Sequence, residues 1–408
     1  MKHFILIVLA LSLFAQEDIK LVELAYKNGL KPVPMNSKEL LGDKVILGKK
    51  LFFDKDLSLG RDISCASCHS FDKGGADGRP TAIGHKNREN PSHLNTPTIL
   101  NTAFSKKFFW DGRSNTLQDQ AKGPLQATFE MSITPELAEK RISAHREYKP
   151  MFINSFGSDE VTFDKIANAI AAYEKTLVTR GRYDDFLLGY FDALTREEKE
   201  GLHLFITKSC VGCHNGVGLG GQVVRKFPLS YHAIWSLEKP TEIKKIRKQY
   251  SEFLEGLAEE KELSDFVRIS RLYSKMGEKN VNLLREGFFN KIDEKELLKV
   301  MTTSACTSCH EKEDESIKEE LLHKVAFPFE NRGGFLGSLE PRGYFRVPLL
   351  RNVVSTAPYF HNGSVKKLEE VIKLMGRHQG RVNLSDREIE KIVAFLKAVD
   401  GKRSKRDY

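Results

Sequence analysis

The sequence has no long hydrophobic stretch after its first 15 residues, and no single residue type dominates its composition. Its 408 residues include 30 glycines and 14 prolines, which are ordinary shares that exclude collagen-like and low-complexity chains. Lysine and arginine (64) outnumber aspartate and glutamate (55), and the resulting net charge of +9 is spread along the chain. We therefore expect no nucleic-acid partner. The lack of further apolar runs of about 20 residues excludes a polytopic membrane protein.

The N-terminus has the pattern of an export signal. Lys2 and His3 precede an apolar run over residues 4–15, and an acidic segment follows at once. This run is too short to span a bilayer, which takes about 20 residues. We predict a removable signal peptide over residues 1–15 with cleavage after Ala15, and an uncleaved anchor is the alternative.

No cysteine lies outside three Cys-x-x-Cys-His motifs. These motifs are Cys65, Cys68 and His69; Cys210, Cys213 and His214; and Cys306, Cys309 and His310. Two thiols at this spacing attach one haem covalently, and the adjacent imidazole ligates its iron. Structural zinc does not require the histidine, a thioredoxin-like redox pair needs a βαβ context, and disulfides rarely join cysteines this close. The motif count predicts three haem c groups.

Helical periodicity dominates the rest of the sequence. Apolar residues after Thr162 recur at spacings of four, three and four. Thr195 with Glu198, and Ser385 with Glu388, form capping-box patterns that predict two helix starts. No sustained alternation of apolar and polar residues predicts a sheet. We therefore expect an all-α protein.

An internal repeat precedes the first two motifs. Gly48-Lys-Lys-Leu-Phe52 comes before CASCH, and Gly201-Leu-His-Leu-Phe205 comes before CVGCH. Each repeat lies on a predicted helix that leads to its motif, as a small c-type cytochrome domain begins. The third motif follows a helical stretch over residues 294–301 without this signature. The expected architecture is two cytochrome-like haem domains with a helical insertion that carries the third motif.

Six stretches around the first two motifs and near the C-terminus carry a longer pattern. They are SCASCHSFDKGGADGRPTAIGH, LNTPTILNTAFSKKFFWDGR, DQAKGPLQATFEM, TFDKIANAIAAYEKTLVT, CVGCHNGVGLGG and YFRVPLLRNVVSTAPYFHNGSVKKLEEVIKLMG. In content and order they resemble the bacterial di-haem cytochrome c peroxidases. The resemblance covers most of residues 36–232 and 325–400.

This resemblance implies a division of the chain into domains. Residues 16–190 would form an N-terminal peroxidatic haem domain. Residues 191–400 would form a C-terminal electron-transfer haem domain, interrupted by the insertion at 233–324. The signal peptide (1–15) precedes these domains, and a basic tail (401–408) follows them.

The resemblance also assigns a distal side to the His69 haem. His85 matches the distal ligand of the peroxidatic iron, which leaves when the enzyme is activated by reduction, and His93 is a nearby alternative. Glu130 matches the carboxylate that shuttles a proton between the peroxide oxygens, and Gln120 would position the peroxide. Without the resemblance, His85 would be read as a solvated loop histidine and Glu130 as a surface residue.

The electron-transfer side is assigned in the same way. Trp110 matches the tryptophan that bridges the two haems, although a lone tryptophan is otherwise a core residue. Met375 matches the sixth ligand of the His214 haem, and thioether ligation raises the potential of an iron. The spacing of Met375 from Leu368 also fits a simple core stripe. Relatives of the MauG type, which oxidise a protein substrate, have tyrosine at the Met375 position.

Two further sites are expected. Asn95, Thr356 and Pro358 match the family's inter-domain calcium site, which uses hard oxygen ligands. The third haem would have His310 as its proximal ligand. Its sixth ligand stays open, and the candidates are His323, His232, Met276 and Met301.

Taken together, the resemblance implies an exported, periplasmic peroxidase that reduces hydrogen peroxide to water. The electrons would come from a reduced c-type cytochrome or a similar one-electron donor, and the family habit is a homodimer. The alternatives are a multi-haem electron carrier in which His85 never leaves, a MauG-like oxidase of protein, and a peroxidase whose extra haem accepts electrons from a membrane quinol.

Overall fold

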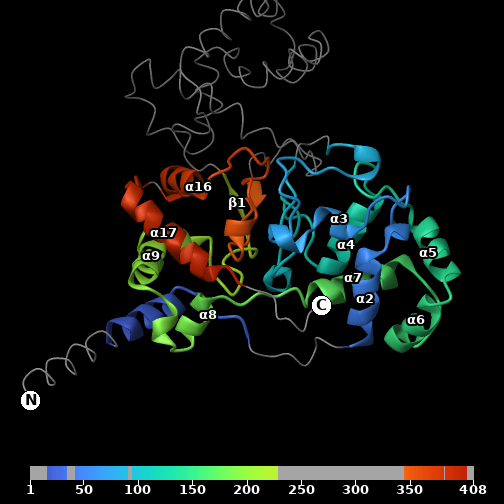
Figure 1. The fold of residues 1–408 in the computed structure, drawn as a ribbon, viewed down its shortest axis with the longest axis horizontal. Coiled ribbons are helices and arrows are strands. Elements are labelled where there is room, and N and C mark those ends of the chain that lie inside the picture. The colour runs from blue at the N-terminus through green and yellow to red at the C-terminus, as the bar shows by residue number, and fades with distance from the viewer. Residues whose placement is uncertain (1–15, 35–41, 91–93, 228–343, 381, 402–408) are drawn as a thin grey trace, which may run out of the picture.

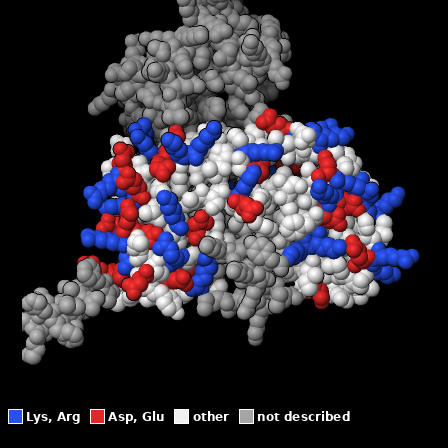
Figure 2. Space-filling model, in the orientation of Figure 1, with Lys and Arg blue, Asp and Glu red and all other residues white. Residues whose placement is uncertain are grey.

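The computed structural model describes residues 16–34, 42–90, 94–227, 344–380 and 382–401. The predicted signal peptide, His93, the whole insertion and all but the first residue of the basic tail lie outside these residues. The described chain is mostly helical and forms two lobes side by side (Figure 1). No helix among the described residues is both long and apolar enough to cross a membrane. Basic and acidic side chains are interspersed over the face shown in Figure 2.

The core of the first lobe is centred on the packing of helix α2 against helix α7. Its helices are α2 (Asp43–Phe53), α3 (Cys65–Cys68), α4 (Leu117–Gln126), α5 (Pro135–Ala144), α6 (Tyr148–Phe156) and α7 (Phe163–Glu174). Thr162 caps α7 by accepting from the backbone N–H of Lys165, as the sequence predicts. Leu51 and Phe52 on α2 and Ile166 on α7 are fully buried at the centre of this core.

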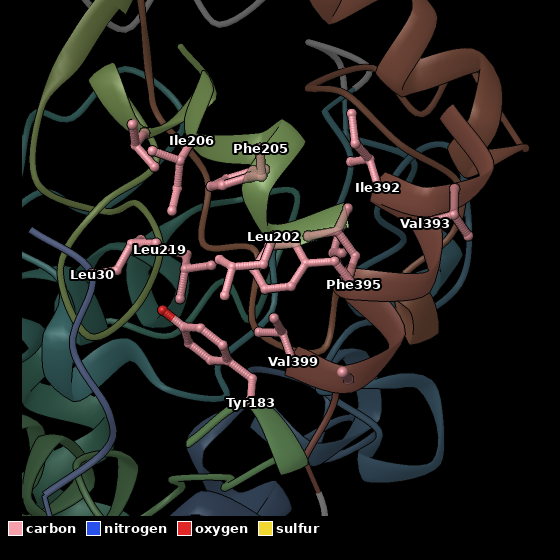
Figure 3. Close-up of a cluster of buried hydrophobic side chains, with 14 of the residues drawn as sticks. Leu30, Tyr183, Leu202, Phe205, Ile206, Leu219, Ile392, Val393, Phe395 and Val399 are labelled. Atoms are coloured by element: carbon pink, nitrogen blue, oxygen red, sulfur yellow. The ribbon is translucent and has the colours of Figure 1, made fainter. Parts of the chain in front are cut away.

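The second lobe is built in the same manner. Its helices are α8 (Arg182–Leu187), α9 (Arg196–Thr207), α16 (Leu368–Met375) and α17 (Asp386–Val399). Both predicted capping boxes are confirmed, at the starts of α9 and α17. Leu202 and Phe205 from α9 meet Phe395 and Val399 from α17 in the core shown in Figure 3.

The repeated glycines explain why the two lobes resemble each other. A Cβ at Gly48 on α2 would overlap the carbonyl oxygen of Ala169 on α7. A Cβ at Gly201 on α9 would overlap the carbonyl oxygen of Lys391 on α17 in the same way. Each glycine lets two helix backbones approach closely. The following phenylalanine of each repeat, Phe52 or Phe205, is then buried beside the crossing.

One pair of short strands departs from the all-α expectation. β1 (Val224–Lys226) and β2 (Tyr344–Arg346) pair antiparallel, with Val224 opposite Arg346. They lie on the two sides of residues 228–343, so the pair brings the chain together across that interval (Figure 1). The strands are too short to show an alternating pattern in the sequence.

Short turns connect the helices. The 3-10 turns are Lys55–Leu57, Phe71–Lys73, His85–Asn87, Thr102–Phe104, Phe191–Ala193, Cys210–Gly212 and Val353–Ser355, and a π-helical turn spans Gly376–Gly380. Most of the motif residues therefore lie on short turns that the helices hold in place.

A buried ion pair ties the N-terminal segment to the second lobe. Both carboxylate oxygens of Asp184 accept from the guanidinium of Arg351, at 2.7 and 2.9 Å, and both side chains are fully buried. The same carboxylate accepts from the backbone N–H of Val33 at 2.7 Å. Ala25 and Leu30 belong to the core of the second lobe rather than the first. Residues 16–34 therefore pack against the second lobe.

A chain of buried amides joins the two lobes. Asn101 donates to the hydroxyl of Thr179 at 2.9 Å and to the side-chain oxygen of Asn352 at 3.2 Å. Asn352 in turn donates to Asp400 at the end of α17, at 2.7 Å. Because buried amides are costly to leave unpaired, this network holds the lobes in one relative position.

Candidate functional site

The first Cys-x-x-Cys-His motif forms a single helical turn, α3, that presents its histidine to the interior. The Nδ1 atom of His69 donates to the carbonyl oxygen of Gly75 at 2.9 Å, which leaves on Nε2 the lone pair that a metal ligand needs. Burial lowers the pKa of His69, so its imidazole is neutral. Burial also raises the pKa of the Cys68 thiol to about 11. The motif therefore places two cysteine thiols, of which that of Cys68 is held in its protonated form, next to a neutral imidazole.

His85 lies in a short turn. Among the described residues, only one of its two ring nitrogens has a hydrogen-bond partner. Its Nδ1 atom lies 2.9 and 3.0 Å from the two carboxylate oxygens of Asp62. Its Nε2 atom is buried and has no hydrogen-bond partner among the described residues. Burial alone would raise the pKa of Asp62, but hydrogen bonds from the Lys86 backbone and the His85 ring hold it at about 2. A buried nitrogen without a partner fits a metal ligand.

Glu130 lies directly against the His85 turn. The backbone N–H of His85 donates to the carbonyl oxygen of Glu130 at 2.7 Å. A Cβ at Gly84 would overlap the carbonyl oxygen of Phe129, so glycine is needed for this approach. The Glu130 carboxylate also contributes to the raised pKa of the Cys68 thiol, which places it near the first motif. The structure thus brings Cys68, His85 and Glu130 together.

The environment of Glu130 suits a proton carrier. Burial raises the pKa of its carboxyl to about 7, and the positive charge of Arg113 opposes that shift only in part. A carboxyl that titrates near neutral pH can both accept and release a proton. Gln120 lies half-buried on α4, the helix that leads into the Glu130 turn. Gln120 therefore lies one helical element before Glu130 in the chain.

The second motif lines a cavity of about 300 Å³ in the second lobe. Cys210, Cys213 and His214 line it, and so does Met375 at the end of α16. The Nδ1 atom of His214 donates to the carbonyl oxygen of Leu219 at 3.2 Å, and burial lowers the pKa of this histidine to about 4. The π-helical turn that follows Met375 is a feature often found at functional sites. Two thiols, a neutral imidazole and a thioether therefore line one cavity.

Trp110 lines the same cavity. Its indole N–H donates to the backbone carbonyl of Asn95 at 2.8 Å, and its own carbonyl accepts from the backbone N–H of Arg346 in β2 at 2.7 Å. Its ring lies 6.4 Å from that of His361, edge to face. Asn95 therefore fixes the indole at the wall of the cavity that the second motif lines.

Asn95, Thr356 and Pro358 also line this cavity. The side-chain N–H of Asn95 donates to the carbonyl oxygen of Arg79 at 2.6 Å. The side-chain oxygen of Asn95 therefore points away from Arg79. Within the described residues, no three histidine, cysteine or acidic side chains gather into a metal cluster. A cation here would depend on amide and carbonyl oxygens, which suit calcium.

Two residues that fix His85 carry no signal in the sequence. Asp62 precedes the first motif, and nothing in its spacing indicates a contact with a residue 23 positions away. Gly60 lies against the same ring, since a Cβ there would lie 2.7 Å from its Nδ1 atom. The third motif and its candidate ligands lie outside the described residues: Cys306, Cys309, His310, His323, His232, Met276 and Met301.

These donors fit two covalently bound c-type haems, one in each lobe. His69 and His85 would hold the iron of the first haem, and His214 and Met375 that of the second. Each haem supplies an iron that stores or passes one electron, and an iron with an exchangeable ligand also binds small oxygen species. Fold and site therefore define a c-type haem oxidoreductase with two haem lobes.

Comparison with known proteins narrows this class. Residues 42–191 match the family model of di-haem cytochrome c peroxidase, and residues 343–380 match a RoxA-like, cytochrome c-like model. The chain is 34% identical to cytochrome c551 peroxidase of Nitrosomonas europaea, over 83% of this chain and 74% of that protein. It is 33% identical to cytochrome c551 peroxidase of Pseudomonas aeruginosa, over 85% and 75% of the two chains. The chain belongs to the di-haem cytochrome c peroxidase family and is a peroxidase with covalent haem c.

Solved structures share the fold. A MauG-like protein associated with microbial copper homeostasis superposes with a TM-score of 0.57 at 23% identity, covering 92% of this chain and 93% of that one. The di-haem peroxidase BthA of Burkholderia thailandensis gives a TM-score of 0.51 at 19% identity, covering 88% and 86%. The mostly helical, two-lobed architecture is thus one that known di-haem proteins adopt.

Proposed function

We propose that the chain reduces hydrogen peroxide to water in the first lobe, between His69 and Glu130. The reaction takes one peroxide, two electrons and two protons, and it yields two waters. The observation that carries this proposal is the half-buried Glu130, whose carboxyl has a pKa raised to about 7 and whose carbonyl oxygen accepts from the backbone N–H of His85. A group with such a pKa accepts the proton of the attacking peroxide oxygen and returns it to the leaving oxygen.

The other residues of the first lobe prepare this step. His85 would be the exchangeable ligand of the haem that His69 holds, and its release would open the site at which peroxide binds. Gln120 orients the peroxide from α4. Arg113, whose charge favours the ionised form of Glu130, keeps part of this carboxyl able to accept a proton at neutral pH.

Electrons enter through the second lobe, from a reduced c-type cytochrome or a similar one-electron donor. Two donor molecules supply the two electrons in turn. Met375 and His214 would hold the haem that accepts these electrons, and Trp110, at the wall of their cavity, would bridge it to the first lobe. Unchanged turnover with an external donor in Trp110→Phe would contradict this route.

Several further features belong to the same proposal. Calcium binds to oxygens of Asn95, Thr356 and Pro358 and supports the junction of the lobes. The third motif, in the insertion, holds an additional haem. The protein works in the periplasm after residues 1–15 have been removed. It acts as a homodimer. The boundary between the domains lies near residue 190, with residues 16–34 packed on the second lobe.

A second candidate function has one observation in its favour. The Asp62 carboxylate holds the His85 ring, and permanent ligation would make the protein an electron carrier. The two functions are separated by mixing haem-loaded protein with peroxide and a reduced c-type cytochrome, before and after partial reduction with calcium present. Peroxide-dependent oxidation of the cytochrome after partial reduction supports the peroxidase. Its absence, with an unchanged bis-histidine spectrum, supports the carrier.

A further inference from the structure

The carboxylate of Asp62 makes two separate contacts with the His85 turn. It accepts from the ring Nδ1 of His85 at 2.9 and 3.0 Å and from the backbone N–H of Lys86 at 3.0 Å. The first contact fixes the rotation of the imidazole, and the second fixes the backbone next to it. The His85 side chain is 3% exposed and that of Asp62 is 38% exposed, so the carboxylate holds the ring from the solvent side.

The backbone of this turn adopts an uncommon conformation. Lys86 and Asn87 both have positive φ values, 58° and 57°, in the left-handed region that non-glycine residues seldom adopt. Such conformations persist where surrounding contacts impose them. The contacts here include those with Asp62, the hydrogen bond from His85 to Glu130, and the backbone hydrogen bonds of Gly84 and His85 with Arg88.

Hydrogen bonds hold the segment that leads to Asp62, and the backbone N–H of Asp62 itself donates to the hydroxyl of Ser58 at 3.2 Å. Arg141 on α5 donates to the carbonyl oxygens of Asp56 and Ser58 at 3.1 and 2.6 Å, and to that of Leu59 at 3.0 Å. Gly60 lies so close to the His85 ring that any side chain at this position would push the ring away. The ring is therefore held in a slot between a glycine and a carboxylate.

We propose that Asp62 is a positioning residue that fixes His85 with Nε2 toward the iron of the His69 haem and sets how readily His85 gives way to another ligand. The inference rests on the proposed function, in which His85 is that ligand. A carboxylate on Nδ1 selects the tautomer whose Nε2 carries the lone pair, and it makes that nitrogen a better donor. Losing such a partner weakens ligation by about 10- to 100-fold.

The test uses haem-loaded full-length protein in the ferric state, without peroxide. The variants are Asp62→Ala, Asp62→Asn and Asp62→Glu, with His85→Ala as the reference for complete loss of the ligand. Asp72→Asn is the matched control, because Asp72 is an exposed carboxylate near His69 and carries the same charge. Electron paramagnetic resonance gives the low-spin fraction, cyanide titration gives competition with His85, and haem content and circular dichroism report folding.

The expected result is graded. Asp62→Ala loses low-spin signal toward the His85→Ala level and binds cyanide about 10-fold more tightly. Asp62→Asn, with one acceptor oxygen, is intermediate, and it carries the test if Asp62→Ala does not fold. Asp62→Glu, which keeps a carboxylate, retains most of the parent signal, and Asp72→Asn matches the parent.

Two outcomes would overturn the proposal. One is a parent-like low-spin fraction and cyanide affinity in folded Asp62→Ala and Asp62→Asn. The other is a spectrum that His85→Ala leaves unchanged, because His85 would then not be a ligand. Neither readout involves turnover, so failure of the parent to reduce peroxide would refute the proposed reaction separately.

Discussion

The backbone N–H of His85 donates to the carbonyl oxygen of Glu130 at 2.7 Å, so the proposed distal ligand and the proposed proton carrier share one hydrogen bond. The two residues come from different turns of the first lobe. A displacement of the His85 turn must break or stretch this bond. Under the proposed function, release of His85 would therefore also affect the placement of Glu130.

The pH dependence of turnover should reflect Glu130. Its pKa is raised to about 7 by burial, and the ionised form is the one that accepts a proton from peroxide. Turnover at limiting peroxide should therefore fall as the pH drops through about 7. A steady-state pH profile of the parent measures this limb, and Glu130→Gln should show no such limb. A parent profile that is flat between pH 5 and about 8 would contradict the assignment.

Replacing Met375 by histidine should lower the reduction potential of the haem in the second lobe. Thioether ligation favours the reduced iron more than imidazole does. A redox titration followed by the absorbance of this haem gives the potential, and turnover with a cytochrome donor should slow with it. Val371→Ala on the same helix is the control, since Val371 lines the cavity without a donor atom. Equal potentials in the parent and Met375→His would exclude Met375 as the ligand.

Alanine at Gly201 should force α9 and α17 apart. Its Cβ would overlap the carbonyl oxygen of Lys391, which is backbone and cannot rotate away. We expect a loss of about 1–3 kcal/mol in the free energy of unfolding, measured by denaturant titration of the haem-loaded protein. Gly42→Ala is the control, because nothing lies within 4 Å of a Cβ at that position. Equal stability of the two variants would refute the close crossing.

Asp184→Asn should be strongly destabilising. It removes one charge from a pair whose side chains are both fully buried and leaves the guanidinium of Arg351 without its counter-charge. The expected loss is about 3–5 kcal/mol in the free energy of unfolding. Asp185→Asn is the control, since the adjacent Asp185 pairs with Arg180 at a partly exposed position. A loss below about 1 kcal/mol, as surface pairs give, would show that the pair is not buried in solution.

The sequence was sufficient to predict the features that depend on local or repeated patterns. The capping boxes of α9 and α17 are confirmed because a cap needs only residues three positions apart. The repeated glycines indicated two equivalent helices, and the structure adds that each one permits a helix crossing. The resemblance brought His85 and Glu130 into one site, and their shared hydrogen bond agrees with it.

Other features depend on contacts that no local pattern records. β1 and β2 have three residues each and are far apart in the sequence, so their pairing is decided by the tertiary fold. The packing of residues 16–34 on the second lobe depends on the buried carboxylate of Asp184. Asp62 reaches His85 through two irregular loops, where periodicity gives no information.

The central claim is that Glu130 moves the proton that peroxide cleavage requires. The most direct measurement is peroxide-dependent oxidation of a reduced c-type cytochrome by the parent, Glu130→Gln and Glu136→Gln, each with equal haem content. Glu136 is an exposed carboxylate in the first turn of α5 and serves as the control. The account predicts a loss of about 10²- to 10⁴-fold in Glu130→Gln and none in Glu136→Gln. Equal turnover in all three proteins would contradict it.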